Sequence, residues 1–363
     1  MITFEQAVAI AIDYNSRFDI YREYENAFEF FYDTVWEVTG PQPYVVSKET
    51  GEGMPLPAAI GAHLERGNLL GEGKIPASMR PSLFMLRDAV YGAAVGDALG
   101  VPYEFMERGS FECTGMSSGG AHGKPAGTFS DDTSMMLATC ESICMRGRVD
   151  ARDMRKRFGK WLYEGDYTAD GNVFDVGNTV ATALAEGRGL DGERSNGNGS
   201  LMRIAPLAYI GIDDGEIRAA SAVTHAHRIS TESCVCFVKL IRNVIGGNTL
   251  ENSIKYSTPE DEKFAFLSDV TSWPRDAIRS GGYVLDTLGA AIWCFANTSS
   301  YAECVLAAVN LGRDSDTTAC VAGALAGAYY GYDAIPAEWL ATLRGKDVIE
   351  RCLFPGFVSV RSW

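Results

Sequence analysis

Two short acidic stretches, far apart in the chain, carry the residue types best suited to metal chemistry. They are Ser130-Asp131-Asp132-Thr133 and Asp314-Ser315-Asp316-Thr317. Each opens an apolar run, and Asp, Ser and Thr are favoured at helix N-caps, where a side-chain oxygen accepts from an exposed backbone N–H. A cap needs one such oxygen, so both stretches hold more carboxylates than capping uses. The excess predicts a shared cation site.

Bringing these acids together would be costly without a counter-ion. Close carboxylates repel by about 4 kcal/mol per pair at about 4 Å and an effective dielectric constant of about 20. Four close carboxylates form six such pairs, which together would cost roughly 20 kcal/mol. This exceeds the usual stability of a domain, about 5–15 kcal/mol. Their oxygens are hard ligands that select Mg²⁺, Mn²⁺ or Ca²⁺ over zinc. The alternative is two unrelated surface caps, and spacing alone does not decide between these interpretations.

Two further acids lie near small residues. Asp97 lies in an apolar run of small residues, where an ionised acid needs a charged partner or bonds to backbone N–H groups, and its ordinary interpretation is a buried structural acid. Glu104 follows Gly100 and Pro102, which place it on a turn, where it faces a cleft or is an ordinary surface acid.

Glycine-rich loops supply the next candidates. In Gly197-Asn198-Gly199-Ser200 the glycines allow backbone N–H groups to approach a ligand at a helix start, although Asn-Gly loops are common. Asp175 lies on another turn with a possible helix cap. His225 and His227 lack the soft partners of a zinc site, so either one of them lines a cleft or both are structural.

The elements that must position these residues are predicted to be helices. Small-residue and apolar patterns favour a compact all-α region from residue 83, without the strand–helix alternation of a parallel sheet. The expected helices span 83–100, 134–147, 151–164, 176–187, 215–227, 230–246, 262–268, 281–295, 300–310 and 319–330.

The first eighty residues differ in character. Aromatic residues from Phe18 to Val35 recur at three- and four-residue steps, which predicts a helix across residues 1–38. A Gly- and Pro-rich stretch up to Pro81 predicts a linker or an extended arm. We therefore expect residues 1–80 to form an N-terminal helical and extended arm and residues 81–363 to form the compact domain. The aromatic face either packs on that domain or meets a partner.

Composition limits the possible partners. The 32 Lys and Arg residues against 47 Asp and Glu give a net charge of −15, which argues against nucleic acid or an anionic membrane as a partner. No apolar run is long enough for a membrane span, and the N-terminus lacks a signal-peptide pattern. Nine cysteines without such a pattern are expected to be reduced, in a cytoplasmic protein.

The ordered set of motifs resembles the ADP-ribosylglycohydrolase family. It comprises Gly96-Asp97-Ala98-Leu99-Gly100 with Glu104, both acidic stretches, Phe174-Asp175-Val176-Gly177-Asn178-Thr179, the loop from Gly197 to Arg203, and Thr224-His225. The set covers roughly three quarters of the chain. Ser130 lies where the family more often has Thr, and serine keeps the hydroxyl.

The resemblance implies a site for two Mg²⁺ ions, or Mn²⁺, and hydrolysis of a bond to ADP-ribose, most often on arginine. The metal positions carried over are Ser130, Asp131, Asp132, Asp314, Asp316 and Thr317. The catalytic positions are Glu104, Asp132 and Asp314, with Glu104 as a gating or acid–base residue. The substrate positions are Asp175 at the distal ribose, Asn198, Gly199 and Ser200 at the diphosphate, and His225 in the cleft.

The N-terminal extension resembles those of immunity proteins that act against ADP-ribosylating interbacterial toxins. This suggests that residues 1–80 bind and block a cognate ADP-ribosyltransferase toxin, while the remaining domain removes ADP-ribose from modified proteins. The alternatives are a hydrolase for another ADP-ribosyl linkage or a small molecule, without a toxin partner, and a purely binding immunity protein.

Overall fold

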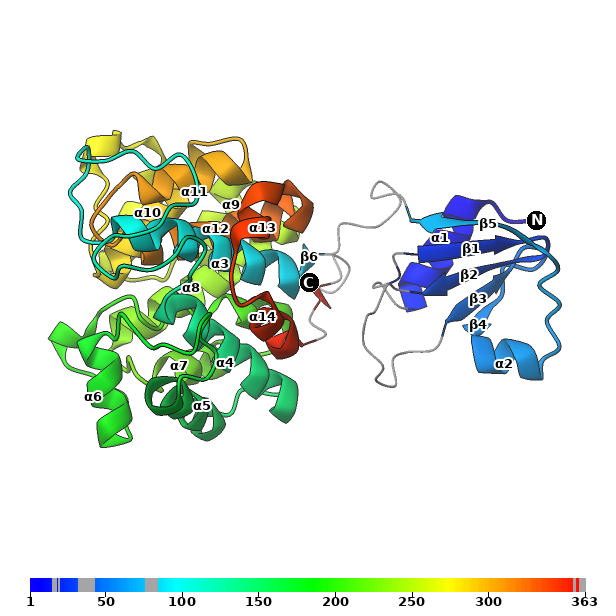
Figure 1. The fold of residues 1–363 in the computed structure, drawn as a ribbon, viewed down its shortest axis with the longest axis horizontal. Helices are drawn as coiled ribbons and strands as arrows, with labels where there is room; N and C mark the ends of the chain where they lie inside the picture. Colours follow the sequence, from blue (N-terminus) through cyan, green and yellow to red (C-terminus); the bar gives the residue numbers. More distant parts are fainter. Residues whose placement is uncertain (15–17, 19, 32–42, 76–83, 355–356, 359–363) are drawn as a thin grey trace. The chain divides into compact units, whose positions relative to one another are not determined.

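A computed structural model describes residues 1–14, 18, 20–31, 43–75, 84–354 and 357–358. The chain forms two compact units, Met1–Leu83, which we call the sheet unit, and Phe84–Trp363, which we call the helical unit (Figure 1). The predicted helical fold is confirmed for the second unit, and a small sheet precedes it.

The helical unit consists of helices joined by short 3₁₀ turns and loops. Its α-helices are α3 (Leu86–Gly100), α4 (Asp131–Arg146), α5 (Ala151–Glu164), α6 (Asn178–Glu186), α7 (Asp214–Ser221), α8 (Arg228–Ile245), α9 (Leu250–Ser257), α10 (Val284–Ala296), α11 (Tyr301–Val309), α12 (Ser315–Tyr330), α13 (Ala337–Thr342) and α14 (Lys346–Cys352). Its 3₁₀ helices are η2 (Val101–Tyr103), η3 (Glu193–Ser195), η4 (Ala205–Tyr209), η5 (Glu262–Ser268), η6 (Val270–Ser272), η7 (Arg275–Ala277) and η8 (Tyr332–Ala334). A two-stranded sheet pairs β6 (Phe84–Met85) with β7 (Phe357–Val358).

Most predicted helix positions agree with the structure, with differences at the ends and in one helix type, and α9, α13 and α14 were not predicted. The predicted 319–330 helix begins earlier, at Ser315, because the second acidic stretch forms its first turn. The predicted 215–227 helix already ends at Ser221. The segment 262–268 is a 3₁₀ helix, η5.

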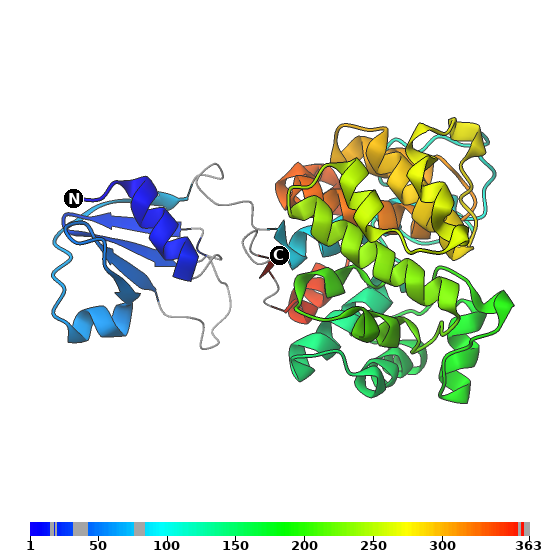
Figure 2. The ribbon, with the colours of Figure 1, turned by 180° about the vertical axis from the view of Figure 1, so that it is seen from behind.

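Helices α3 and α12 pack against each other at the centre of the helical unit (Figure 1). Nearly every residue of both helices is buried, which suits their Ala- and Gly-rich sequences. Helices α10 and α11 pack against α12, and α8 crosses the back of the unit beside α7 and α9 (Figure 2). The small residues predicted to allow close packing therefore form the central helix pair.

The sheet unit holds a five-stranded antiparallel sheet in the order β4-β3-β2-β1-β5. Its elements are α1 (Phe4–Tyr14), β1 (Ile20–Tyr24), β2 (Ala27–Phe31), β3 (Tyr44–Ser47), β4 (Gly53–Pro55), α2 (Leu56–Gly61) and β5 (Leu69–Lys74). One sheet face buries Phe28, Phe30 and Val46 against α1. The opposite face buries Ala27 and Val45 together with Ala59 of α2.

The predicted helix across residues 1–38 is therefore wrong beyond α1. Phe28 and Phe30 alternate with Ala27 and Glu29 as a strand requires, and β1 pairs with β5, whose residues lie about fifty positions away in the chain. Long-range pairing of this kind outweighs a local three- and four-residue spacing. The predicted linker is also partly wrong, since it contains β4, α2 and β5; residues 76–83 and Val35 lie outside the described residues.

Across the described parts of the chain, we find no helix with the length and hydrophobicity that crossing a membrane requires.

Candidate active site

The crossing of α3 and α12 sets the position of the second acidic stretch. A Cβ added at Gly96 would lie 2.1 Å from the carbonyl oxygen of Ala319, and one at Gly100 would lie 2.3 Å from Cα of Asp316. The Ser315 hydroxyl donates to the Gly100 carbonyl over 3.0 Å. Since only glycine permits these contacts, the end of α3 holds the first turn of α12 at backbone contact.

Asp97, near the end of α3, holds the first turn of α4. Its carboxylate accepts from the backbone N–H of Ser130 at 2.9 and 3.0 Å, from that of Thr133 at 3.1 Å, and from the Thr133 hydroxyl at 2.6 Å. Burial raises the pKa of Asp97 to about 6, and these hydrogen bonds oppose the rise. Asp97 is therefore the buried acid bonded to N–H groups that we expected, and it links α3 to the first acidic stretch.

The two acidic stretches meet at Asp132. Its Oδ2 accepts from the Ser130 hydroxyl at 3.1 Å and from the Thr317 hydroxyl of α12 at 3.2 Å. Oδ1 of Asp132 and Oδ2 of Asp316 are buried, and neither has a hydrogen-bond partner within the described residues. Two surface caps would not meet in this way, so the alternative of unrelated caps is excluded.

The electrostatics of this cluster favour a cation. Burial raises the pKa values of Asp131, Asp132 and Asp316 well above their ordinary range, and repulsion from neighbouring carboxylates adds to the rise. Burial also raises the pKa of Asp314, against hydrogen bonds that lower it. Some of these buried carboxylate oxygens receive no hydrogen bond within the described residues, and two hydroxyls lie beside them. Such oxygens are suitable ligands for a hard divalent cation. The residues present therefore fit a metal site.

Asp175 belongs to the same cluster. One oxygen each of Asp131, Asp132 and Asp175 lie within 4.8 Å of one another, close enough to share an ion. The backbone of Asp175 has a φ of 53°, an unusual value for a residue other than glycine. The resemblance implied a contact to the distal ribose, but in the structure its carboxylate stands beside the metal-type acids.

Glu104 faces the cluster from the turn after α3. Burial, followed by repulsion from Asp175 and Asp314, raises the pKa of Glu104 to about 9. The turn is fixed by two backbone hydrogen bonds of 2.6 Å, from Phe105 N–H to the Arg313 carbonyl and from Arg313 N–H to the Met106 carbonyl. Glu104 is thus tied to the residue directly before Asp314.

His122 is a site residue that the sequence did not indicate. Its Nε2 lies 2.5 Å from Oε2 of Glu104, and both side chains are largely buried. The residue lies in an irregular glycine-rich loop, and no spacing relates it to Glu104. Its only sequence signal is that the chain has four histidines.

The glycine-rich loop after η3 reaches the cluster through Asn198. The side-chain amide donates to Oδ2 of Asp314 at 2.8 Å and to the Thr287 hydroxyl at 2.9 Å, and the backbone N–H donates to the Gly282 carbonyl at 3.1 Å. Within the described residues, the backbone N–H groups of Gly199 and Ser200 have no acceptor. The loop therefore has a fixed link to Asp314 and backbone N–H groups that this link does not use, at the partly exposed Gly199 and the buried Ser200.

His225 and Ser200 support this loop from behind. A Cβ added at Gly199 would lie 2.9 Å from Cε1 of His225. His225 is only 2% exposed. Burial and the charge of Arg203 lower the pKa of His225 to about 3, so the ring is neutral. The Ser200 hydroxyl accepts from Ser221 at 2.9 Å. These side chains pack beneath the loop, where the resemblance implied contact with the substrate.

His227 has a structural position outside the cluster. Its ring accepts from the backbone N–H of Ile229 at 3.2 Å and caps α8.

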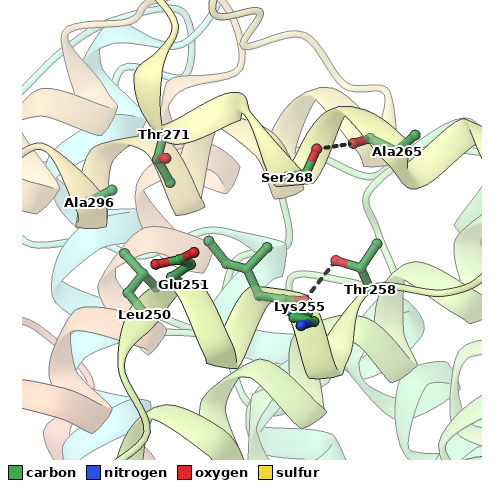
Figure 3. Close-up of a pocket in the computed structure, with 9 residues that line it drawn as sticks. Leu250, Glu251, Lys255, Thr258, Ala265, Ser268, Thr271 and Ala296 are labelled. Atoms are coloured by element: carbon green, nitrogen blue, oxygen red, sulfur yellow. Dashed lines mark hydrogen bonds between the residues drawn. The ribbon is translucent and has the colours of Figure 1, made fainter.

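A cavity of about 790 Å³ lies on another part of the helical unit, between α9, η5 and η6. Figure 3 shows Leu250, Lys255, Thr258 and Ser268 around it. None of its lining residues is one of the site residues described above, so cavity size does not identify the chemistry here.

Comparison with known proteins agrees with this geometry. The profile of the ADP-ribosylglycohydrolase family matches residues 82–359, which include the whole acidic cluster. The chain belongs to this family of hydrolases. One solved structure with a similar fold is described as an ADP-ribosylglycohydrolase-related protein complex, with a TM-score of 0.62 and 33% identity, covering 74% of this chain and 95% of that one.

Named relatives share most of the helical unit. An ADP-ribosylarginine hydrolase of Serratia proteamaculans is 33% identical, covering 74% of this chain and 77% of the relative. One from Pseudomonas putida is 31% identical, covering 73% and 76%. An ADP-ribosyl-[dinitrogen reductase] glycohydrolase of Rhodospirillum rubrum is 31% identical, covering 71% and 90%.

Proposed function

We propose that this chain is a hydrolase, dependent on Mg²⁺ or Mn²⁺, that removes ADP-ribose from modified arginine side chains of proteins. The observation that carries the proposal is the bond from Thr317 to Asp132, which joins two acid-bearing helix starts around carboxylate oxygens that have no donor. The linkage is supported by the names of the Serratia and Pseudomonas relatives, which are ADP-ribosylarginine hydrolases.

The cation would be held by the oxygen ligands of the two helix starts. These are Ser130, Asp131, Asp132, Asp314, Asp316 and Thr317, and Asp175 is close enough to join them. When bound, such ions supply Lewis-acid charge that orients the ribose hydroxyls and polarises water. Two ions are proposed, as in the resemblance stated above.

Glu104 is proposed to handle the proton of the reaction. Hydrolysis breaks the bond between C1 of the ribose and the arginine nitrogen; water gives its hydroxyl to C1 and a proton to the nitrogen. Burial raises the pKa of Glu104, which favours the protonated carboxyl that can donate to the leaving nitrogen. Asp132 and Asp314 stabilise the positive charge that develops on the ribose.

The loop from Gly197 to Ser200 is proposed to bind the diphosphate. The N–H groups of Gly199 and Ser200, which have no acceptor among the described residues, are proposed as donors for phosphate oxygens. Binding through backbone donors is compatible with a protein of net charge −15, because it needs no basic surface.

The test is turnover of an ADP-ribosylated arginine protein by Asp314→Ala and Asp316→Ala variants, in Mg²⁺ and in excess EDTA. Release of ADP-ribose should be lost in both variants and in EDTA, while the exposed Asp333→Ala control keeps wild-type activity. Turnover that survives EDTA would refute the metal assignment. A parallel serine-linked substrate and free ADP-ribosyl small molecules test the linkage, and faster release from either would refute the choice of arginine.

A second proposal concerns the sheet unit, which we propose binds and blocks a cognate ADP-ribosyltransferase toxin. The unit has its own core and precedes the family profile, which starts at residue 82. It also exposes Leu69 and Leu70 at the start of the edge strand β5, with residues 52% and 59% exposed. Such apolar exposure on an edge strand is available for contact with another chain.

This second proposal is tested by pull-down with a transferase encoded beside the gene. Leu69→Asp with Leu70→Asp should weaken capture at least tenfold, while Ile60→Asp, on the separate helix α2, serves as the matched surface control. Unchanged capture by the Leu69 and Leu70 variant would remove β5 from the interface. Absence of capture by wild type would leave a hydrolase without a toxin partner.

A further inference from the structure

His122 lies close to two carboxyl groups of the site, those of Glu104 and Asp175. Its Nε2 is 2.5 Å from Oε2 of Glu104, and the two side chains are 15% and 4% exposed. One ligand-type atom from each of Glu104, His122 and Asp175 lie within 4.8 Å of one another. The imidazole is therefore bonded to Glu104 and close to Asp175.

The ring itself is held in place by aromatic neighbours. Its centroid lies 5.0 Å from that of Phe174 and 5.9 Å from that of Phe105. Phe105 directly follows Glu104, and Phe174 directly precedes Asp175. His122 thus contacts both segments that carry the two carboxylates.

Glu104 needs such a partner to face the cluster. Glu104 is only 5% exposed, and a buried polar group without a hydrogen-bond partner favours rotation of the side chain toward water. A glutamate side chain has enough free rotation to make that movement. A hydrogen-bond donor at the position of Nε2 opposes it.

We propose that His122 is a positioning residue that holds the Glu104 carboxyl toward the acidic cluster for hydrolysis. The inference rests on the proposed function, because it assigns a role within that reaction. His122 acts through Glu104, so its loss lowers kcat while KM and metal affinity stay nearly constant.

The length of the side chain gives a sharp test. His122→Gln places an N–H donor about as far from the backbone as Nε2, His122→Asn places it one bond closer, and His122→Leu supplies none. We expect His122→Gln to retain most of kcat, and His122→Asn and His122→Leu to lose about 10- to 100-fold, the cost of leaving a buried group without its hydrogen-bond partner. The helix-cap variant His227→Leu is the matched control and keeps kcat. Equal losses in all three His122 variants would overturn the proposal.

A double-mutant cycle separates positioning from a general structural effect. In a Glu104→Gln background, His122→Leu should cause less than about a twofold further loss, because neighbouring residues that act together are not additive. The same large loss in both backgrounds would show that His122 does not act through Glu104.

A spectroscopic measurement keeps the test independent of turnover. The chain has four histidines, so ¹⁵N-histidine labelling gives a simple spectrum. Glu104→Gln should shift the His122 Nε2 resonance and leave those of His225 and His227 in place, and an unchanged His122 resonance would refute the contact. Wild-type turnover of the arginine substrate is the separate measure of the proposed function, so failure of one can be told from failure of the other.

Discussion

Replacement of Asp316 by Asn should stabilise the metal-free protein. Asp316 is fully buried in the first turn of α12, and its Oδ2 has no hydrogen-bond partner within the described residues. Burial, with repulsion from Glu104, Asp132, Asp314 and Asp175, raises its pKa well above the ordinary 3.8. An amide has the same shape, carries no charge, and can donate to the surrounding carboxylates.

The magnitude has an upper limit set by proton uptake. At pH 7 the folded protein can protonate Asp316 instead of keeping it ionised. Protonation costs about 1.4 kcal/mol for each unit by which the pH exceeds the ordinary pKa of 3.8. The penalty that Asn removes is therefore at most about 4 kcal/mol. We expect a gain of about 2–4 kcal/mol, which corresponds to a rise in Tm of about 5–10 °C for a unit of this size.

The assay is thermal unfolding of wild type, Asp316→Asn and the exposed control Asp333→Asn, in EDTA and in excess Mn²⁺. In EDTA the Asp316 variant should unfold at the highest temperature. In Mn²⁺ the wild type should gain about 2.7 kcal/mol at a concentration of about 100 times Kd, and the variant, which lacks a ligand, should gain less. A variant that is less stable than wild type in EDTA would refute the electrostatic reasoning.

Three further predictions concern the surroundings of the cluster. Asn198→Ala removes the donor to Asp314, so we expect a 10- to 100-fold loss of kcat/KM, about 1.5–3 kcal/mol, measured by steady-state kinetics; a loss below twofold would contradict the link. Gly96→Ala places a Cβ 2.1 Å from a carbonyl oxygen and should lower the free energy of unfolding by more than about 3 kcal/mol in urea titrations. Gly159→Ala, in α5 with no atom within 4 Å of the added Cβ, is its control and should be neutral or stabilising by up to about 1 kcal/mol. The pKa of Glu104 is raised from 4.5 to about 9 in the folded protein, so the folded state holds this proton more tightly than the unfolded state does. The contribution of Glu104 to the stability of the metal-free protein is therefore complete below pH 4.5 and is lost as the pH rises to 9. Glu104→Gln should flatten the fall of Tm between pH 5 and 9 in EDTA, and an unchanged slope would contradict the assignment.

The metal-type ligands could be predicted because their signal is local. Asp131 and Asp316 each lie at the start of an apolar helix, where spare carboxylates are visible in the sequence. Their meeting depends on the crossing of α3 and α12, which the glycines suggest but do not specify. The sequence therefore indicated the carboxylates, and the structure shows that they converge.

The parts that could not be predicted depend on distant contacts. Phe28 and Phe30 fit a helical spacing as well as a strand, and only the pairing of β2 with β1 and β3 decides between them. His122 meets Glu104 across an irregular loop, so no periodicity relates them. His225 was expected to line the cleft because a motif contains it, yet burial beneath Gly199 leaves little of it accessible.

Asn198 also has a consequence for how two ligands influence each other. One residue holds Asp314 through its side chain and shapes the anion-facing loop through its carbonyl, which accepts from Leu201 N–H at 2.7 Å. A cation at Asp314 and an anion on the loop therefore share one rigid connection. Thermodynamic linkage requires that each changes the affinity of the other by the same factor. If the metal tightens the binding of ADP-ribose, ADP-ribose must tighten the binding of the metal by the same factor, and the affinity for product would then depend on metal concentration.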